Sequence, residues 1–115
     1  MFDHVGLRVK DVAASGRFYR ALLAPLGHVA DESGTGFGPS GAPALWLHAA
    51  RGGSGCHIAF SAPDRAAVDR FHAAGLAAGG RDNGAPGLRA DYSPTYYAAF
   101  VVDPDGNNVE AVFTG

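Results

Sequence analysis

Three residues of this 115-residue chain are candidate ligands of one transition metal, namely His4, His57 and Glu110. Glu110 stands inside the otherwise apolar segment NVEAVF, residues 108–113, where a carboxylate needs water or a partner because unpaired burial of its charge is costly. Two imidazoles and one carboxylate suit a divalent metal with open coordination positions, and Zn, Fe(II), Mn, Ni and Co all fit this donor set. The alternative is that both histidines are ordinary strand residues and that Glu110 lies on a solvated face.

The two histidines open two segments that align without a gap. HVGLRVKDVAASGRFYRALLAPLG starts at His4, and HIAFSAPDRAAVDRFHAAGLAAGG starts at His57. Many of the matches are alanine, but others are residue types that coincide less readily by chance. These are the pairs His4 and His57, Asp11 and Asp64, Arg17 and Arg70, Phe18 and Phe71, Leu23 and Leu76, and Gly27 and Gly80. We interpret the chain as an internal duplication.

Each copy begins with apolar residues at alternate positions, which predicts a strand with one apolar face. A helix is expected next in each copy, capped by Asp11 or Asp64 and closed by Gly27 or by Gly79 and Gly80. In the second helix we expect the apolar residues Val68, Phe71 and Leu76 to face the core. Short strands are then expected at about 28–32, 35–38, 44–49, 87–92, 96–102 and 108–113.

The segment Asp103-Pro104-Asp105-Gly106 predicts a tight turn between the last two strands, because proline fixes φ and glycine allows a positive φ. Each half therefore has the pattern βαβββ. The predicted fold is α+β, with one domain over residues 1–115 and modules at about 1–52 and 53–115. The modules are expected to form an open, cup-shaped mixed β-sheet with the helices on the outside.

Strand alternation predicts which side chains share the inner face of this sheet. If Val5, Leu7 and Val9 face the helix, His4 and Arg8 face the other way, and the same reasoning applies to His57. In the last strand, Val109, Ala111 and Phe113 form the helix-facing set, which leaves Glu110 on the face of the two histidines. We therefore expect His4, His57 and Glu110 to converge as ligands of one divalent metal per site.

Three further residues of the first module are expected on the same face. In the strand ALWLHA, Leu45 and Leu47 mark the helix-facing side, so either Trp46 or His48 takes the place that Glu110 has in the second module. Trp46 would form an aromatic wall of a substrate pocket, whereas His48 would add a nitrogen ligand. Arg8 is expected to form a structural ion pair, with binding of an anionic substrate as the alternative.

Several of these segments resemble the vicinal oxygen chelate superfamily, which includes glyoxalase I, fosfomycin- and bleomycin-resistance proteins and extradiol dioxygenases. They are HVGLRVKD followed by FY and LAPLG, HIAFSAPDRAAVDRFHAA, and FVVDPDGNNVEAV, the last being the most specific. The resemblance implies paired βαβββ modules around a metal, taken from one chain or from two, usually in a homodimer. It carries the family's ligand positions onto His4, His57 and Glu110.

The chain also departs from particular members of that superfamily. Glyoxalase I has a fourth, glutamate ligand where the best match here is Trp46, whereas fosfomycin-resistance proteins keep three ligands and often read LWL, as residues 45–47 do. Extradiol dioxygenases use two histidines and one glutamate on Fe(II), which the triad also matches. In the distinctive segment GLRADYSPTYYAAF, residues 87–100, short relatives commonly have a histidine where this chain has Ser93.

That segment also supplies tyrosines that are candidates for hydrogen bonding to a metal-bound substrate oxygen. We expect Tyr97 or Tyr92 to orient this oxygen, with Glu110 as the metal-bound carboxylate, and Tyr96 to contact the substrate. The alternative for all three tyrosines is plain packing between strands.

Composition limits the classes of partner. A formal net charge of −2 and a pI near 6.2 disfavour nucleic acid and anionic membranes as partners, and no apolar run approaches the ~20 residues that span a bilayer. The single cysteine, Cys56, excludes an internal disulfide framework, and the chain opens without a leader-like segment, so we expect a cytoplasmic protein. The expected partners are a small-molecule substrate and a second copy of the chain.

The predicted function is chelation of vicinal oxygens of a small substrate on the metal, for lyase, isomerase, transferase or dioxygenase chemistry. The alternative is a binding protein without turnover that sequesters an aromatic or drug-like ligand, as bleomycin-resistance proteins do.

Overall fold

The computed structural model describes residues 1–51 and 55–115 of the chain. Within these residues the fold is α+β, as predicted, and each half has the order βαβββ. The elements are β1 (Val5–Val9), α1 (Val12–Leu23), the 3-10 turn η1 (Ala24–Leu26), β2 (Val29–Ala30), β3 (Gly36–Gly38), β4 (Leu45–Ala49), β5 (His57–Ser61), α2 (Arg65–Ala77), β6 (Arg81–Leu88), β7 (Tyr97–Val102) and β8 (Asn108–Phe113). The expected module boundary between residues 52 and 53 lies outside the described residues.

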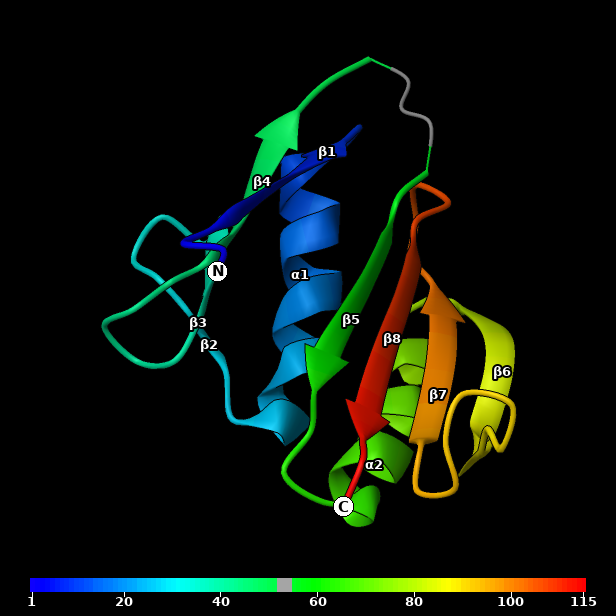
Figure 1. The fold of residues 1–115 in the computed structure, drawn as a ribbon. Coiled ribbons are helices and arrows are strands. Elements are labelled where there is room, and N and C mark those ends of the chain that lie inside the picture. The colour runs from blue at the N-terminus through cyan, green and yellow to red at the C-terminus, as the bar shows by residue number, and fades with distance from the viewer. Residues whose placement is uncertain (52–54) are drawn as a thin grey trace.

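The two halves repeat one sheet topology (Figure 1). The first sheet has the strand order β1-β4-β3-β2 and the second has β5-β8-β7-β6. β1 pairs in parallel with β4, as β5 does with β8, and the other pairings are antiparallel. In the described part of one chain the strands thus form two four-stranded sheets rather than one continuous sheet. β1 and β5 each lie at an edge of their own sheet.

The ends of the helices follow the local signals in the sequence. Asp11 accepts a hydrogen bond from the backbone N–H of Ala14, and Asp64 accepts one from that of Ala67, so both predicted N-caps are confirmed. Gly27 ends the first helical segment with φ of 88°, a left-handed conformation that favours glycine.

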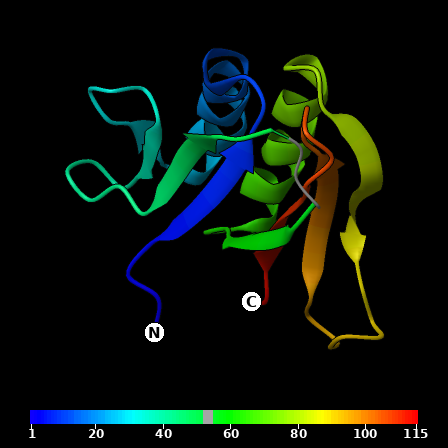
Figure 2. The same ribbon diagram turned by 90° about the horizontal axis from the view of Figure 1, so that it is seen from above.

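The core lies between the helices and the sheets, and both helices lie on the same side of the molecule (Figure 2). Val68 and Phe71 of α2 are buried in the core, as predicted. The prediction is wrong for Leu76, whose side chain is 39% exposed. Gly75 takes the buried position instead. A Cβ there would come within 2.7 Å of a methyl carbon of Leu22, so the absence of a side chain lets the two helices approach closely.

The predicted turn at residues 103–106 is confirmed, and it also joins the two modules. The buried carboxylate of Asp103 accepts hydrogen bonds from the backbone N–H groups of Asp105 and Asn107, and from the hydroxyl of Tyr19 on α1 at 2.6 Å. Asp105 in turn accepts hydrogen bonds from the Lys10 backbone N–H and the Ser15 hydroxyl. These contacts hold the β7–β8 hairpin against the start of α1.

One predicted strand is misplaced. The strand expected at 87–92 is β6 at Arg81–Leu88, and the chain then turns, with the Arg89 N–H donating to the Tyr96 carbonyl oxygen. The strand RDNGAPGL is rich in residues that disfavour strands, and its pairing with β7 is interrupted by register shifts around Gly84. Pairing with β7 therefore overrides the local preference.

Candidate functional site

Glu110 and His57 form a close pair on neighbouring strands. Glu110 on β8 lies opposite Ala59 on β5, and Ala59 is two residues beyond His57. Glu110 is only 2% exposed. Its Oε1 lies 2.9 Å from Nε2 of His57, and its Oε2 accepts a hydrogen bond of 2.5 Å from the hydroxyl of Tyr96. The acidic residue in the apolar strand is thus buried, and both of its oxygens have partners.

The ring of His57 is oriented by its surroundings. Its Nδ1 lies 3.1 Å from the backbone carbonyl oxygen of Asn108, and its ring stacks on Phe100 with centroids 6.2 Å apart. The carbonyl oxygen and the Glu110 carboxylate both only accept, whereas a neutral imidazole has a single N–H, so a neutral ring that donates from Nδ1 presents its lone pair at Nε2. A lone pair that faces a carboxylate is favourable only with a proton or a cation between them.

This donor set fits two of the ligands of a divalent metal. Bonds of about 2.1 Å from one metal to nitrogen and oxygen, at about a right angle, place the two donors about 3 Å apart, as found here. A carbonyl that holds the other imidazole nitrogen is also a common support for a histidine ligand.

The predicted third ligand is not brought to this pair within one chain. In residues 1–51 and 55–115, no group of three or more His, Cys, Asp or Glu side chains is arranged to hold a metal. His4 is exposed just before β1, and its Nδ1 lies 2.8 Å from Asp3. β1 and β5 are edges of separate sheets, so strand parity alone does not make His4 and His57 neighbours.

The tyrosines separate onto different faces. Tyr96 donates to Glu110, and burial, together with this hydrogen bond, raises the pKa of Tyr96 to about 12. Tyr92 is 66% exposed and packs edge-on against Tyr96. Tyr97 does not lie where a residue that orients a metal-bound oxygen is expected. Its hydroxyl donates to Asp69 of α2, on the helix side of the sheet and away from Glu110.

The strand register decides between Trp46 and His48. Trp46 lies opposite Gly6 of β1, just as Glu110 lies opposite Ala59 of β5. Because Gly6 and Ala59 are each two residues beyond the repeated histidine, Trp46 holds the place of Glu110. His48 lies two pairs further along, opposite Arg8. The first module therefore presents an indole where the second presents a carboxylate.

Arg8 does not form the structural ion pair that we expected. It is exposed on β1, and none of the ion pairs found in the described residues involves it.

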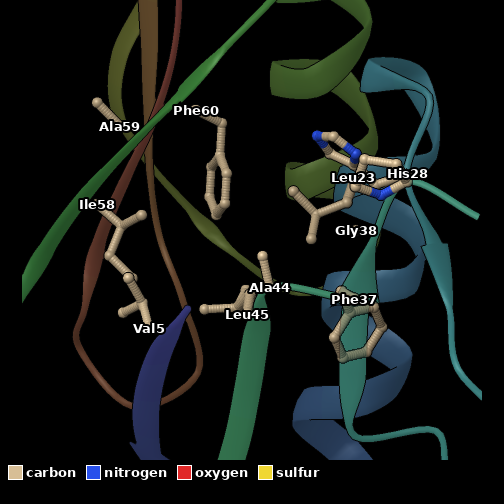
Figure 3. Close-up of a pocket in the computed structure, with 11 residues that line it drawn as sticks. Val5, Leu23, His28, Phe37, Gly38, Ala44, Leu45, Ile58, Ala59 and Phe60 are labelled. Atoms are coloured by element: carbon tan, nitrogen blue, oxygen red, sulfur yellow. The ribbon is translucent and has the colours of Figure 1, made fainter. Parts of the chain in front are cut away.

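An apolar cavity of about 220 Å³ lies between the edges of the two modules (Figure 3). β1 contributes Val5, and β5 contributes Ile58, Ala59 and Phe60. His28 lines the cavity with a buried Nδ1 that has no hydrogen-bond partner among the described residues, and burial lowers its pKa. The cavity does not include His57 or Glu110, so it is separate from the candidate metal ligands.

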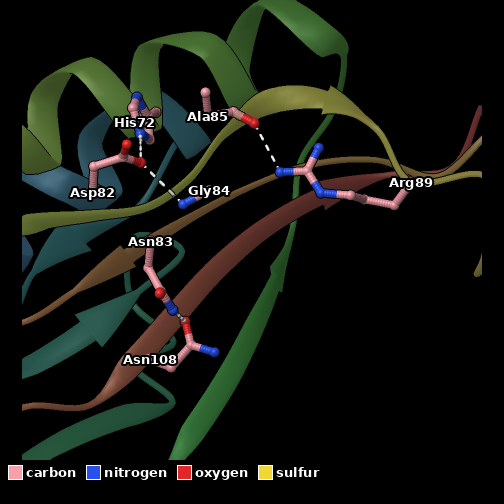
Figure 4. A network of polar contacts seen from close by, with 7 residues as sticks. All are labelled: His72, Asp82, Asn83, Gly84, Ala85, Arg89 and Asn108. Atoms are coloured by element: carbon pink, nitrogen blue, oxygen red, sulfur yellow. Dashed lines mark hydrogen bonds and ion pairs between the residues drawn. The ribbon is translucent and has the colours of Figure 1, made fainter.

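Sequence reasoning missed three residues around the Glu110 pair. Phe100 lies directly opposite Glu110 in the β7–β8 pairing, and this could have been found by extending the parity argument across the hairpin. The side-chain oxygen of Asn108 accepts a hydrogen bond from the Asn83 side-chain amide (Figure 4), and its backbone carbonyl oxygen supports His57. The guanidinium of Arg89 lies 5.4 Å from the Phe100 ring centroid. The strand expected at 87–92 includes Arg89 as an ordinary strand residue, so nothing in the sequence connected it with the site.

The duplicated βαβββ fold, with histidines at equivalent positions and a buried glutamate in the last strand, is the architecture of vicinal oxygen chelate proteins. The family model described as the Glyoxalase/Bleomycin resistance protein/Dioxygenase superfamily matches residues 1–111. The chain belongs to this superfamily, which confirms the resemblance seen in the sequence. No curated protein matches the chain.

Solved structures agree with this assignment. A crystal structure described as a glyoxalase/bleomycin resistance protein from Albidiferax ferrireducens is 35% identical, with 97% of this chain and 98% of that chain covered and a TM-score of 0.78. A lactoylglutathione lyase from Agrobacterium tumefaciens is 25% identical, with 97% and 91% covered and a TM-score of 0.65. A family enzyme from Burkholderia phytofirmans, 19% identical with 98% of each chain covered and a TM-score of 0.75, supports the fold alone.

Proposed function

We propose that the protein binds one divalent metal per site and uses it to chelate vicinal oxygens of a small substrate. The observation that carries this proposal is the buried Glu110, whose Oε1 lies 2.9 Å from His57 Nε2. In this proposal, His57 and Glu110 of one chain and His4 of a second copy hold the metal, so the site is complete only in a homodimer.

The edges of the two sheets support the contribution of a second copy. β1 and β5 both end their strand orders, so each has backbone groups on one side that its own sheet does not pair. His4 directly precedes β1, and His57 begins β5 with a side chain that is 49% exposed. If β1 of one copy lies beside β5 of another, the two sheets form the expected cup and His4 approaches the pair.

When bound, the metal would act as a Lewis acid that stabilises negative charge on the substrate oxygens. Tyr96, with its raised pKa, keeps its proton at neutral pH and is a hydrogen-bond donor for Glu110 or for a substrate oxygen. Trp46 and Phe100 would form aromatic walls. Trp46 also means that the site lacks a second carboxylate, which favours bidentate substrates over chemistry that needs another carboxylate as a base.

Elemental analysis tests the metal proposal. We expect about one metal per chain in protein loaded with Zn(II), Fe(II), Mn(II), Ni(II) or Co(II) and then desalted, and loss of that metal in His57→Ala, Glu110→Ala and His4→Ala. His72→Ala is the matched control, because His72 pairs with Asp82 at 2.9 Å on the helix side. A wild-type chain that retains no metal would contradict the proposal.

A second candidate is a binding protein that sequesters an aromatic ligand without turnover. It is favoured by the mutual pairing of His57, Glu110 and Tyr96, which satisfies the carboxylate without a metal, and by the nearby aromatic rings of Tyr92 and Phe100. Metal-free protein that binds aromatic compounds as tightly as loaded protein would support this candidate.

Within residues 1–51 and 55–115, no helix is long and apolar enough to cross a bilayer. A cytoplasmic location, and the absence of nucleic-acid and membrane partners, stay predictions from composition.

A further inference from the structure

Arg89 extends the candidate site beyond the predicted ligands. Phe100 on β7 lies opposite Glu110 on β8, and residues directly opposite each other in an antiparallel pair share a face of the sheet. The His57 ring stacks on Phe100, and the Arg89 guanidinium carbon also lies over this ring, 5.4 Å from its centroid. In the strand order β5-β8-β7-β6, His57 comes from one side of Phe100 and Arg89 follows β6 on the other.

The guanidinium of Arg89 is held in place before any ligand binds. Its Nη2 donates to the Ala85 carbonyl oxygen at 2.8 Å, as Figure 4 shows, and its Nη1 donates to that of Gly87 at 2.9 Å. Two glycines leave room for it: a Cβ at Gly84 would lie 3.1 Å from Nη2, and one at Gly87 would lie 3.3 Å from Nη1. A fixed arginine loses little side-chain entropy when it binds an anion.

The charge of Arg89 has no anionic partner among the described residues. The ion pairs found there all involve histidine, with the carboxylates of Asp3, Asp82 and Glu110 as partners. Arginine has five N–H donors, and its two bonds to carbonyl oxygens leave three. Arg89 is therefore a half-buried cation with free donors at the wall of the candidate site.

We propose that Arg89 binds the carboxylate of an anionic substrate whose vicinal oxygens are chelated at His57 and Glu110. This inference rests on the proposed function and names the substrate class, a small aromatic carboxylate with two adjacent oxygens. Phe100 lies between His57 and Arg89, so a planar substrate that lies across the edge of its ring reaches both. Arginine suits the carboxylate because its planar fork donates two parallel hydrogen bonds.

Two probes of similar size and shape, one anionic and one neutral, test this inference. 3,4-Dihydroxybenzoate and 3,4-dihydroxybenzamide carry the same adjacent hydroxyls, but only the first has a carboxylate. Their dissociation constants are measured by anaerobic calorimetry on Co(II)-loaded protein. We expect the wild type to bind the benzoate about tenfold more tightly than the benzamide, the size of effect typical of one charged hydrogen bond.

Arg89→Gln is expected to remove this preference by weakening the binding of the benzoate more than that of the benzamide, and its urea midpoint, compared with that of the wild type, shows whether it is still folded. Arg89→Lys is expected to retain part of the preference. The matched control is Arg70→Gln, an equal charge change at an exposed residue of α2, on the helix side, and it is expected to keep the preference.

Equal binding of both probes by the wild type overturns the Arg89 inference but leaves the proposed function standing. So does a loss in Arg70→Gln as large as in Arg89→Gln, because the effect would then be one of net charge. If neither probe binds the loaded protein, the proposed function fails, and the inference fails with it.

Discussion

Glu110 shows how a single charged residue is accommodated in an apolar strand. It is almost fully buried, yet both oxygens are engaged, one by His57 and the other by Tyr96. Buried carboxylates are tolerated when their acceptor positions are satisfied, and removal of one partner leaves a costly unpaired group. The environment of Glu110 therefore depends on Tyr96 as well as on His57.

Tyr96→Phe tests this dependence. The variant removes the donor to Glu110 Oε2, so we expect a loss of about 1–3 kcal/mol in the free energy of unfolding of metal-free protein. Urea denaturation measures the change. Tyr92→Phe is the control, because Tyr92 is 66% exposed and contacts Tyr96 through its ring. Equal losses in both variants would argue against the role of the hydrogen bond.

His28 gives a prediction for pH. Burial lowers its pKa in the folded state, so below its ordinary pKa of about 6.5 the unfolded chain binds a proton that the folded chain does not. Stability is therefore expected to fall as the pH drops through about 6.5 towards the lower folded pKa. His28→Gln should lose less stability over this range, measured by urea midpoints at about pH 7.5 and 5.5. Identical pH dependence in the two proteins would refute the prediction.

At the scale of elements, the β7–β8 hairpin does more than reverse the chain. Asp103 and Asp105 bind groups of α1 and of the residues just before it, so the hairpin of the second module is anchored to the first module. The same hairpin sets the register in which Phe100 lies opposite Glu110. A slip of one residue would turn Glu110 towards the helices, because side chains alternate along a strand.

Tyr19→Phe is expected to weaken this anchor. It removes the 2.6 Å hydrogen bond to the buried Asp103 carboxylate, at a cost of about 1–3 kcal/mol in the free energy of unfolding. Tyr97→Phe is the matched control, because it removes a bond of equal length to the exposed Asp69 and is expected to change stability by less than about 0.5 kcal/mol. Chemical denaturation distinguishes these outcomes, and a control as destabilised as Tyr19→Phe would contradict the anchoring role.

At the scale of the whole molecule, the two modules contact each other through α1, η1, α2 and the β7–β8 hairpin, while β1 and β5 remain sheet edges. This arrangement separates His4 from the His57 and Glu110 pair in one chain. The proposed site therefore makes a prediction about assembly, since in a two-fold dimer each site would take residues from both chains.

Mixing two variants that each lack one ligand tests this prediction. His4→Ala and Glu110→Ala are each expected to bind no metal alone, but their heterodimer would contain one intact site, made by His4 of one chain and His57 with Glu110 of the other. After random exchange of subunits, about a quarter of the sites should bind metal. Elemental analysis of the mixture provides the measurement. No recovery after confirmed exchange would mean that the site does not form between chains.

The features that the sequence predicted correctly depend on neighbouring residues. Asp11 and Asp64 cap their helices through backbone groups three residues away, and the turn at residues 103–106 is closed within itself. The errors arose where distant pairing decided the outcome. The strand β6 forms from a segment that disfavours strands because β7 pairs with it, and Tyr97 points towards α2 while Tyr96 reaches Glu110.

The sequence by itself determined the duplicated βαβββ order, the identity of the candidate ligands and the face on which Glu110 lies, because periodicity and capping are local properties of the chain. Only the tertiary structure decided that His57 and Tyr96 are the partners of Glu110, that Trp46 holds the equivalent place in the first module, and that Arg89 joins the site. It also separated His4 from the pair. These outcomes depend on strand order and register between distant segments, which the spacing of residues along one strand does not specify.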